Sequence, residues 1–219
     1  MATPKKVLVT GATGYVGGRL VTRLLDEGMR VRVMARDISR LRDYPWFSQV
    51  EAVQADAQKK ETLAAALHDI DVAYYMLHSL SEHQGFETLE ENMARNFGAV
   101  AITEGVKRII YLGGIAPSKA DLSVHLESRK HTGQLLKDSG VPTTELRAAV
   151  ILGSGSASFE MLRYLTERLP FMVTPKWLNQ RVQPIAIRDV LHYLVLAALD
   201  ESSESKIADI GGRDSLTYK

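Results

Sequence analysis

The chain has 219 residues, with 27 basic and 26 acidic side chains, a formal net charge of +1 and no cysteine. This length suits one α/β domain with a small appendage. The balanced charge excludes an overall field that would favour nucleic acid or an anionic membrane. The lack of cysteine excludes disulfides and thiolate chemistry, and no apolar run reaches the roughly 18 residues of a membrane span. We therefore expect a soluble, cytoplasmic protein with no nucleic-acid partner.

The beginning of the chain predicts a strand, a tight turn and a helix. An apolar strand ends at Val9, and apolar residues at helical spacing begin at Val16. Between them stands the pattern G-x-x-G-x-x-G, formed by Gly11, Gly14 and Gly17. We expect the first glycine to adopt backbone angles that a side chain forbids, the second to admit a diphosphate, and the third to let helix and strand sit close.

This pattern predicts a dinucleotide site, because the amino end of the helix would face the ligand's phosphates. A glycine turn that merely connects two elements is the alternative. The residues expected to contact the cofactor here are Gly11, Thr13, Gly14, Tyr15, Val16 and Gly17.

The end of the second strand, 30–35, predicts which dinucleotide binds. An acidic residue at this position binds the ribose hydroxyls, whereas a basic residue accommodates a 2′-phosphate. The strand is followed by Arg36 and then Asp37, and a planar guanidinium suits a phosphate. We therefore predict NADP(H) as the preferred cofactor, with NAD(H) as the alternative because Asp37 is close. Otherwise Arg36 lies on a solvated turn and pairs with Asp37 or Asp43.

Two further strands, 49–55 and 71–77, add cofactor candidates. Asp56 follows the first of them and can accept a hydrogen bond from an adenine amino group, or else cap the helix that begins at Lys60. Ligands of parallel sheets lie beyond the carboxyl ends of the strands. The other residues that we place beside the cofactor on this ground are Ala57, Met76, Leu77 and His78. For His78, a purely structural hydrogen bond is the alternative role.

Strand and helix patterns alternate along the rest of the chain. We expect helices over 86–105, 122–137 and 159–168, and strands over 108–112, 144–150 and 206–210. This alternation predicts an α/β fold of Rossmann type, with a doubly wound parallel sheet. Residues 1–150 should form the NAD(P)-binding core. Residues 151–219 should belong to the same domain, as a small C-terminal lobe on the substrate side with a last helix and strand.

Several stretches resemble the atypical, extended-type short-chain dehydrogenase/reductase superfamily. They are Val-Thr-Gly-Ala-Thr-Gly-Tyr-Val-Gly-Gly at 9–18, the segment 106–114, and 145–148 followed by 151–153. The run 152–161, with Pro-Ile-Ala-Ile at 184–187, is similar to bacterial NAD(P)H-binding proteins related to NmrA-like regulators and to the complex I accessory subunit. The resemblance covers nearly the whole chain. Some such proteins continue into a further C-terminal domain, which this chain lacks, and a shortened chain would explain the difference.

The resemblance implies a Tyr-x-x-x-Lys pair on the helix after the fifth strand, and this chain departs from it. His125 and Arg129 hold those two positions, on one helix face. Gly113 and Gly114 stand where the superfamily has a serine, with Ser118 nearby. A histidine side chain, whose reference pKa is about 6.5, is a residue type that suits a proton donor at neutral pH. Arg129 could contact the nicotinamide ribose, and we place Gly113 beside the cofactor.

Two classes of function follow from these residues. The first is an NAD(P)H-dependent oxidoreductase that acts on a small-molecule substrate of unknown identity. The second is a catalytically inactive NADP(H)-binding sensor or structural protein, and a sugar-nucleotide epimerase is a third alternative. The missing tyrosine argues against the usual mechanism but leaves a substitute acid open. No metal site is predicted.

Overall fold

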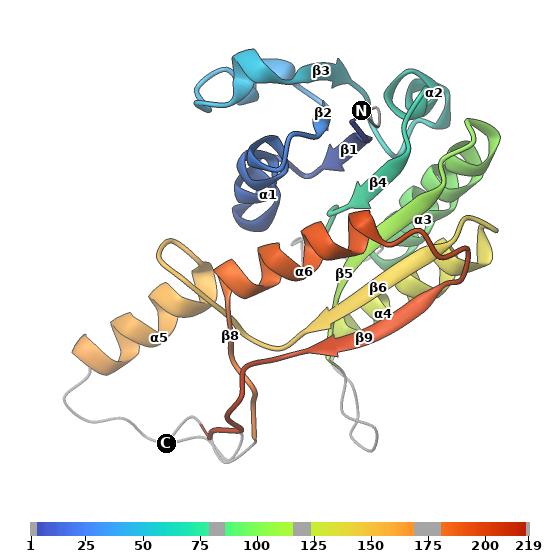
Figure 1. Cartoon of the computed structure of the whole chain (residues 1–219). Coiled ribbons are helices and arrows are strands. Elements are labelled where there is room, and N and C mark those ends of the chain that lie inside the picture. Colours follow the sequence, from blue (N-terminus) through green and yellow to red (C-terminus); the bar gives the residue numbers. More distant parts are fainter. Residues whose placement is uncertain (1–3, 79–85, 116–123, 169–180, 218–219) are drawn as a thin grey trace.

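A computed structural model describes residues 4–78, 86–115, 124–168 and 181–217 (Figure 1). Seven strands form one parallel sheet in the order β3-β2-β1-β4-β5-β6-β9. The strands are β1 (Lys6–Thr10), β2 (Arg30–Ala35), β3 (Glu51–Gln54), β4 (Val72–Tyr75), β5 (Arg108–Gly114), β6 (Thr143–Ala148) and β9 (Lys206–Ile210). The strand order reverses between β1 and β4, where doubly wound sheets bind ligands. The predicted Rossmann-type sheet is confirmed.

Helices cover both faces of the sheet. On one face lie α1 (Tyr15–Asp26) and α6 (Ile187–Leu199), and on the other α2 (Lys60–Leu67), α3 (Phe86–Thr103) and α4 (Val124–Asp138). Strand β1 shows why the apolar runs are continuous. Val9 packs in the core beneath α1 and α6, whereas its neighbour Leu8 packs in the core on the opposite face. Adjacent strand residues point to opposite faces, so a sheet covered on both sides needs apolar residues at both.

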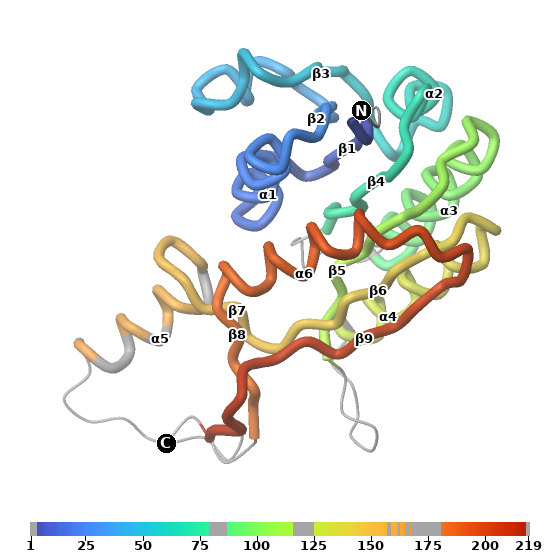
Figure 2. The backbone as a smooth tube through the Cα atoms, in the orientation of Figure 1, coloured from blue at the N-terminus to red at the C-terminus, as the bar shows by residue number. Residues whose placement is uncertain are grey.

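The chain after β6 forms a small extension beside the sheet. β7 (Ile151–Leu152) and β8 (Ile185–Ala186) are far apart in sequence yet pair in parallel (Figure 2). Helix α5 (Ala157–Arg168) follows β7 and projects away from the main sheet (Figure 1). Most of the expected substrate-side lobe, 169–180, and Ser118 lie outside the described residues. The division at residue 150 stays a prediction.

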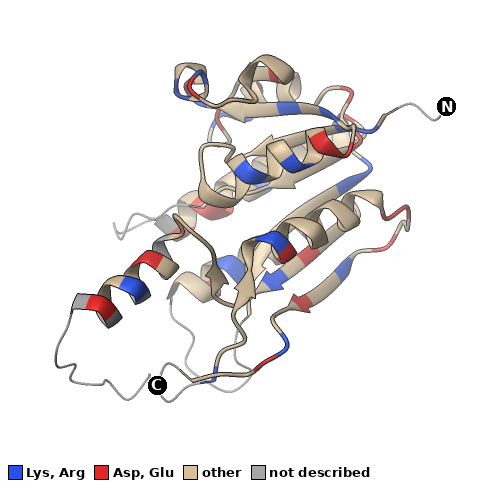
Figure 3. Ribbon diagram, turned by 60° about the vertical axis from the view of Figure 1, so that its left-hand side comes forward, with Lys and Arg blue, Asp and Glu red and all other residues tan. Residues whose placement is uncertain are grey.

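Charged residues of both signs are mixed along the helices and strands (Figure 3). This distribution agrees with the formal net charge of +1. Among the helices of the described ranges, none is both long enough and apolar enough to cross a membrane.

Candidate functional site

The glycine turn after β1 has a geometry that only glycine permits at two positions. Gly11 has a φ of +64°, and a Cβ atom there would lie 2.4 Å from the carbonyl oxygen of Met76. A Cβ atom at Gly17 would lie 2.3 Å from the carbonyl oxygen of Gly11. Gly14 has an ordinary φ of −82°. The turn is therefore pressed between the first turn of α1 and the end of β4.

The amino end of α1 presents backbone N–H groups that a diphosphate can use. Gly14 is the N-cap and has no side chain to cap the helix. The first helical amide with a backbone partner is that of Gly18, which donates to Gly14 O at 3.0 Å. The amides of Tyr15, Val16 and Gly17 precede it and lack an intrahelical acceptor. These amides and the positive end of the helix dipole fit the phosphates of a dinucleotide.

Thr10 fixes the end of β4 against this turn. Its buried hydroxyl donates to Tyr74 O at 3.0 Å and accepts from the Met76 amide at 2.8 Å. The hydroxyl thus ties together the carboxyl ends of the two strands that flank the reversal in strand order. The sequence alone did not predict a role for Thr10. Its position as a polar residue at the end of an apolar strand could have indicated one.

Tyr44 supports the turn from its outer side. Its hydroxyl donates to Thr13 O at 3.1 Å, and its ring stacks on Trp46 with the centroids 4.8 Å apart. A pocket of about 460 Å³ lies between these aromatic residues, the glycine turn and the first half of α1, with Gly155 at its rim. No sequence spacing pointed to Tyr44, because its contact with the turn is long-range.

Tyr15 and Arg19 join α1 to the loop after β7. The guanidinium of Arg19 lies 4.0 Å from the centre of the Tyr15 ring and donates to Ser154 O at 3.1 Å. The Tyr15 hydroxyl is buried and has no hydrogen-bond partner within the described part of the chain. A Cβ atom at Gly153 would lie 2.4 Å from that hydroxyl. The cofactor turn and the C-terminal extension are thus in direct contact.

Arg36 and Asp37 do not pair with each other in the structure. The Asp37 carboxylate accepts from the backbone and the hydroxyl of Ser39, at 2.9 and 2.6 Å, and caps the 3₁₀ turn Ile38–Leu41. The hydrogen bonds from Ser39 lower the pKa of Asp37. Arg36 is exposed at the carboxyl end of β2 and makes no ion pair among the residues described, whether with Asp37 or with Asp43.

Asp56 and Ala57 lie at the end of β3, as expected, but Asp56 does not cap α2. The N-cap of α2 is Lys59. The Asp56 carboxylate instead accepts from the Gln58 amide at 3.1 Å, inside the loop that precedes the helix. The alternative role for Asp56, a helix cap, is therefore wrong, because three residues separate it from the start of α2. Ala57 is buried, and its carbonyl accepts from Asn96 at 3.1 Å.

The end of β4 brings three predicted residues next to β5. Met76 and Leu77 are half-buried and His78 is exposed. The His78 ring meets the Tyr111 ring edge-on, with the centroids 6.2 Å apart. Tyr111 is buried and donates to the backbone oxygen of Arg129 at 3.0 Å. Burial raises the pKa of the Tyr111 hydroxyl despite the opposing charge of Arg129, so Tyr111 is a poor proton donor.

The predicted catalytic pair lies on α4, beside the end of β5. A Cβ atom at Gly114 would lie 3.7 Å from Nη1 of Arg129, and one at Gly113 would lie 3.3 Å from the Tyr111 ring. Arg129 is half-buried. His125, one turn nearer the start of α4, is exposed. The geometry thus brings Arg129 to the strand end where Gly113 lies.

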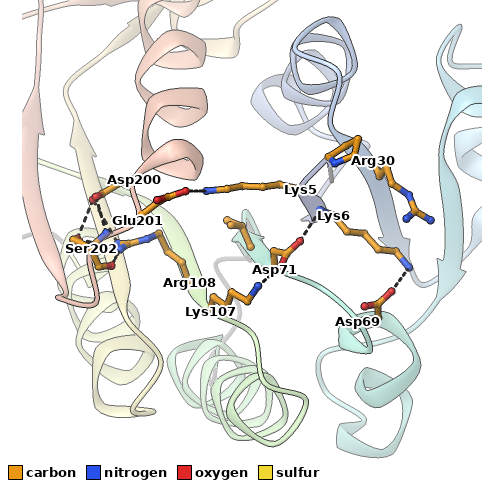
Figure 4. A pocket seen from close by; sticks show the side chains of 12 residues that line it. Lys5, Lys6, Arg30, Asp69, Asp71, Lys107, Arg108, Asp200, Glu201 and Ser202 are labelled. Atoms are coloured by element: carbon orange, nitrogen blue, oxygen red, sulfur yellow. Dashed lines mark hydrogen bonds and ion pairs between the residues drawn. The ribbon is translucent and has the colours of Figure 1, made fainter. Parts of the chain in front are cut away.

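A larger cavity, of about 550 Å³, lies at the other end of the strands, beyond their amino ends (Figure 4). It is lined by residues at the amino ends of β1, β4 and β5, and its cations are mostly paired within the protein. Lys107 lies 2.7 Å from Asp71, and Lys5 lies 3.9 Å from Glu201. Arg108 is buried and donates to Thr144 at 2.7 Å. Ligands of this fold bind beyond the carboxyl ends of the strands, so this cavity is not the expected cofactor site.

The described residues contain no cluster of three or more His, Cys, Asp or Glu side chains that could hold a metal ion. The candidate site at the carboxyl ends of the strands comprises the glycine turn, the strand ends and the start of α4. A family model described as NAD(P)H-binding matches residues 11–158, which contain all of these features. The chain belongs to this NAD(P)H-binding family.

Curated relatives of this NAD(P)H-binding protein include two reductases. One, from Streptomyces griseus, is (4-alkanoyl-5-oxo-2,5-dihydrofuran-3-yl)methyl phosphate reductase, 28% identical over 97% of this chain and 70% of the relative. The other is the ceramide reductase of Caulobacter vibrioides, 26% identical over 89% of this chain and 62% of the relative. The chain is thus shorter than both.

Solved structures of extended short-chain dehydrogenase/reductase type share its fold. MoeE5 in complex with UDP-glucose and NAD superposes with a TM-score of 0.79 at 17% identity, over 97% of this chain and 78% of MoeE5. Together with the family match, this likeness confirms the resemblance to that superfamily. Nicotinamide dinucleotide binding is thereby established for the chain as a family property.

Proposed function

We propose that this chain is an NADP(H)-dependent oxidoreductase that reduces a carbonyl group of a small molecule. The observation that carries the proposal is the glycine turn, because its close packing and its open amides suit a dinucleotide's phosphates. The two reductases that align with at least 89% of the chain support reduction as the reaction class. Both relatives are longer, so their substrates are not carried over.

The preference for NADP(H) rests on Arg36. Its guanidinium is exposed at the end of β2, and the neighbouring acid, Asp37, is engaged by Ser39. A 2′-phosphate would therefore meet a cation that no carboxylate neutralises. On this proposal Asp56 accepts a hydrogen bond from the adenine amino group, through the carboxylate oxygen that Gln58 does not use. The other strand-end residues that we place beside the cofactor are Ala57, Met76, Leu77, His78 and Gly113.

The proposed catalytic pair is His125 and Arg129. NADPH, when bound, supplies a hydride from its nicotinamide ring to the substrate carbon. The carbonyl oxygen then gains negative charge and requires a proton or a hydrogen-bond donor. We assign the proton to His125, which is exposed at the start of α4. A guanidinium group does not release its proton readily, so Arg129 can bind an oxygen but does not replace the lysine as a proton relay.

A screen of carbonyl and quinone compounds for NADPH oxidation tests this proposal. In the variant His125→Ala, turnover should fall at least ~100-fold, the lower end for general acid catalysis, with NADPH affinity unchanged. His131→Ala is the matched control, because His131 is also exposed on α4 and lies near Glu91. Turnover that survives in His125→Ala would exclude His125 as the acid.

The second candidate function is an NADP(H)-binding sensor without catalysis. The observation that favours it is the absence of a Tyr-x-x-x-Lys pair, since His125 and Arg129 occupy those positions. A protein that binds NADPH tightly but oxidises it with no substrate of the screen would support the sensor and contradict the reductase.

A further inference from the structure

Arg129 is a half-buried cation whose guanidinium has no partner in the described structure. Its backbone oxygen accepts from Tyr111, but its side chain makes no hydrogen bond or ion pair with any described residue. A partly desolvated charge without a counter-charge is unfavourable. A ligand with a negative charge would remove that cost.

Arg147 is a second cation at the same strand end. It lies on β6 in register with Gly113 of β5, and its Cγ lies 3.8 Å from the position of a Cβ atom at Gly113. Its Nε donates to Glu145 at 2.8 Å, and its side chain is 27% exposed. The two terminal nitrogens make no hydrogen bond with the residues that the structure describes.

The charge of Glu145 is already balanced without Arg147. Glu145 is buried and also pairs with Lys137 at 3.0 Å, so one carboxylate faces two cations. Two other acids lie nearby. Asp209 pairs with Arg147 in strand register and is exposed, and Glu90 is buried and accepts from Ser128. Within the described ranges, neither forms an ion pair with Arg129 or Arg147.

The two arginines border adjacent glycines. Gly114 has Arg129 beside it and Gly113 has Arg147 beside it, both at the carboxyl end of β5. A Cβ atom at Gly114 would lie 3.1 Å from a methyl group of Leu126, and one at Gly113 would lie 3.4 Å from a carboxylate oxygen of Glu145, so the two glycines let these side chains and the arginines approach the strand end closely. Guanidinium groups bind carboxylate and phosphate oxygens through two parallel hydrogen bonds, which a hydroxyl or a neutral carbonyl cannot match.

We propose that the substrate carries an anionic group, a carboxylate or a phosphate, which Arg129 and Arg147 bind beyond the ends of β5 and β6. The inference rests on the proposed reductase function, because it names the chemical class of that enzyme's substrate. Arg129 then serves the substrate and not the nicotinamide ribose.

A binding experiment tests the site without turnover. Protein saturated with NADP⁺ is titrated with inorganic phosphate and, separately, with benzoate, and the heat of binding is recorded. We expect at least one anion to bind, and Arg129→Gln to weaken it at least about tenfold, the loss expected for charge-assisted hydrogen bonds. The affinity for NADPH should stay within about twofold, because that change is below one hydrogen bond. The preferred anion distinguishes a phosphate substrate from a carboxylate one.

Two further variants complete the design. Arg147→Lys keeps a cation beside Glu145 but loses the planar guanidinium group. It should therefore weaken anion binding while the melting temperature is retained. Arg95→Gln removes an exposed cation that pairs with Glu91 on α3, and it should leave anion binding unchanged. Anion binding that is equal in wild type and Arg129→Gln, or absent from wild type, would overturn the proposal.

A third arm separates this inference from the reductase proposal. If Arg129→Gln weakens NADPH binding as much as anion binding, Arg129 belongs to the cofactor site and the inference is wrong. If the anion binds as expected but no carbonyl compound oxidises NADPH, the reductase proposal fails while the anion site stands. If turnover is found, Arg129→Gln should raise KM for a substrate acid by a larger factor than KM for its methyl ester.

Discussion

The hydroxyl group of Tyr15, on the first turn of α1, lies against Gly153 in the loop after β7. A Cβ atom at Gly153 would be 2.4 Å from that hydroxyl and 2.6 Å from a methyl group of Ile187. Through this contact the cofactor turn supports the C-terminal extension, and Tyr15 also carries one of the helix-end amides that face the expected diphosphate. A substitution at Gly153 should therefore disturb the cofactor site through Tyr15.

The variant Gly153→Ala should be destabilised by about 1–3 kcal/mol, as for other overpacked sites. The measurement is the free energy of unfolding in urea. Tyr15→Phe alone should cost little, because the hydroxyl that it removes is buried without a partner in the described residues. In the double variant, part of the lost stability should be recovered, because phenylalanine lacks the hydroxyl that would clash with the new methyl group. Strictly additive losses would show that the two residues do not compete for space.

Gly17→Ala should weaken NADPH binding at least about tenfold, because the added Cβ pushes α1 away from the turn that holds the phosphates. The contact to be relieved is 2.3 Å, between that Cβ and Gly11 O. Gly28→Ala is the matched control at the other end of α1, where φ is +74° and nothing lies within 4 Å of the added atom. The control should lose about 1 kcal/mol of stability and keep its NADPH affinity by calorimetry. Equal affinities for both variants would contradict the close-packing account.

The lowered pKa of the Asp200 carboxylate predicts how the stability of the protein depends on pH. Its carboxylate accepts from Lys206 at 2.8 Å and from the Ser202 amide at 3.0 Å, which lower its pKa to about 2 from 3.8. Because the pKa in the folded state is below that in the unfolded state, the carboxylate stabilises the protein above pH 4. That contribution is lost as the pH falls from about 4 to about 2.

In thermal unfolding followed by circular dichroism, Asp200→Asn should lower Tm at pH 7 and flatten the fall in Tm between about pH 4 and pH 2. Asp43→Asn is the control, since Asp43 is exposed and makes no ion pair among the described residues. A steep acid transition that is identical in wild type and Asp200→Asn would assign the effect to other carboxylates.

The element order could be predicted from the sequence because each element carries its own periodic pattern. The predicted bounds of β2 and β9 agree with the structure. β5 continues to Gly114, two residues beyond the expected end, because Gly113 and Gly114 pair with Arg147 and Ala148 of β6. Glycine weakens the local strand pattern, so only the cross-strand pairing reveals this extension.

The candidate site was only partly accessible from the sequence. The glycine turn has a fixed spacing within one short segment, so its residues could be named. The contacts of Thr10, Tyr44 and Arg19 join segments that are 31 to 135 residues apart. No local pattern encodes such contacts, because they depend on how the strands are ordered in the sheet. The same holds for Arg147, which meets Gly113 only through the pairing of β5 and β6.

The central claim, an NADP(H) site that uses the glycine turn and Arg36, is tested most directly by calorimetric titration of the purified chain with NADPH and with NADH. We predict tighter binding of NADPH, and a loss of about 1–3 kcal/mol of that preference in Arg36→Ala, the value of a charge-assisted contact. Arg30→Ala should keep the preference, because Arg30 is an exposed cation at the opposite end of the same strand. Equal affinity of the wild-type chain for NADPH and NADH, or a preference that survives in Arg36→Ala, would contradict the account.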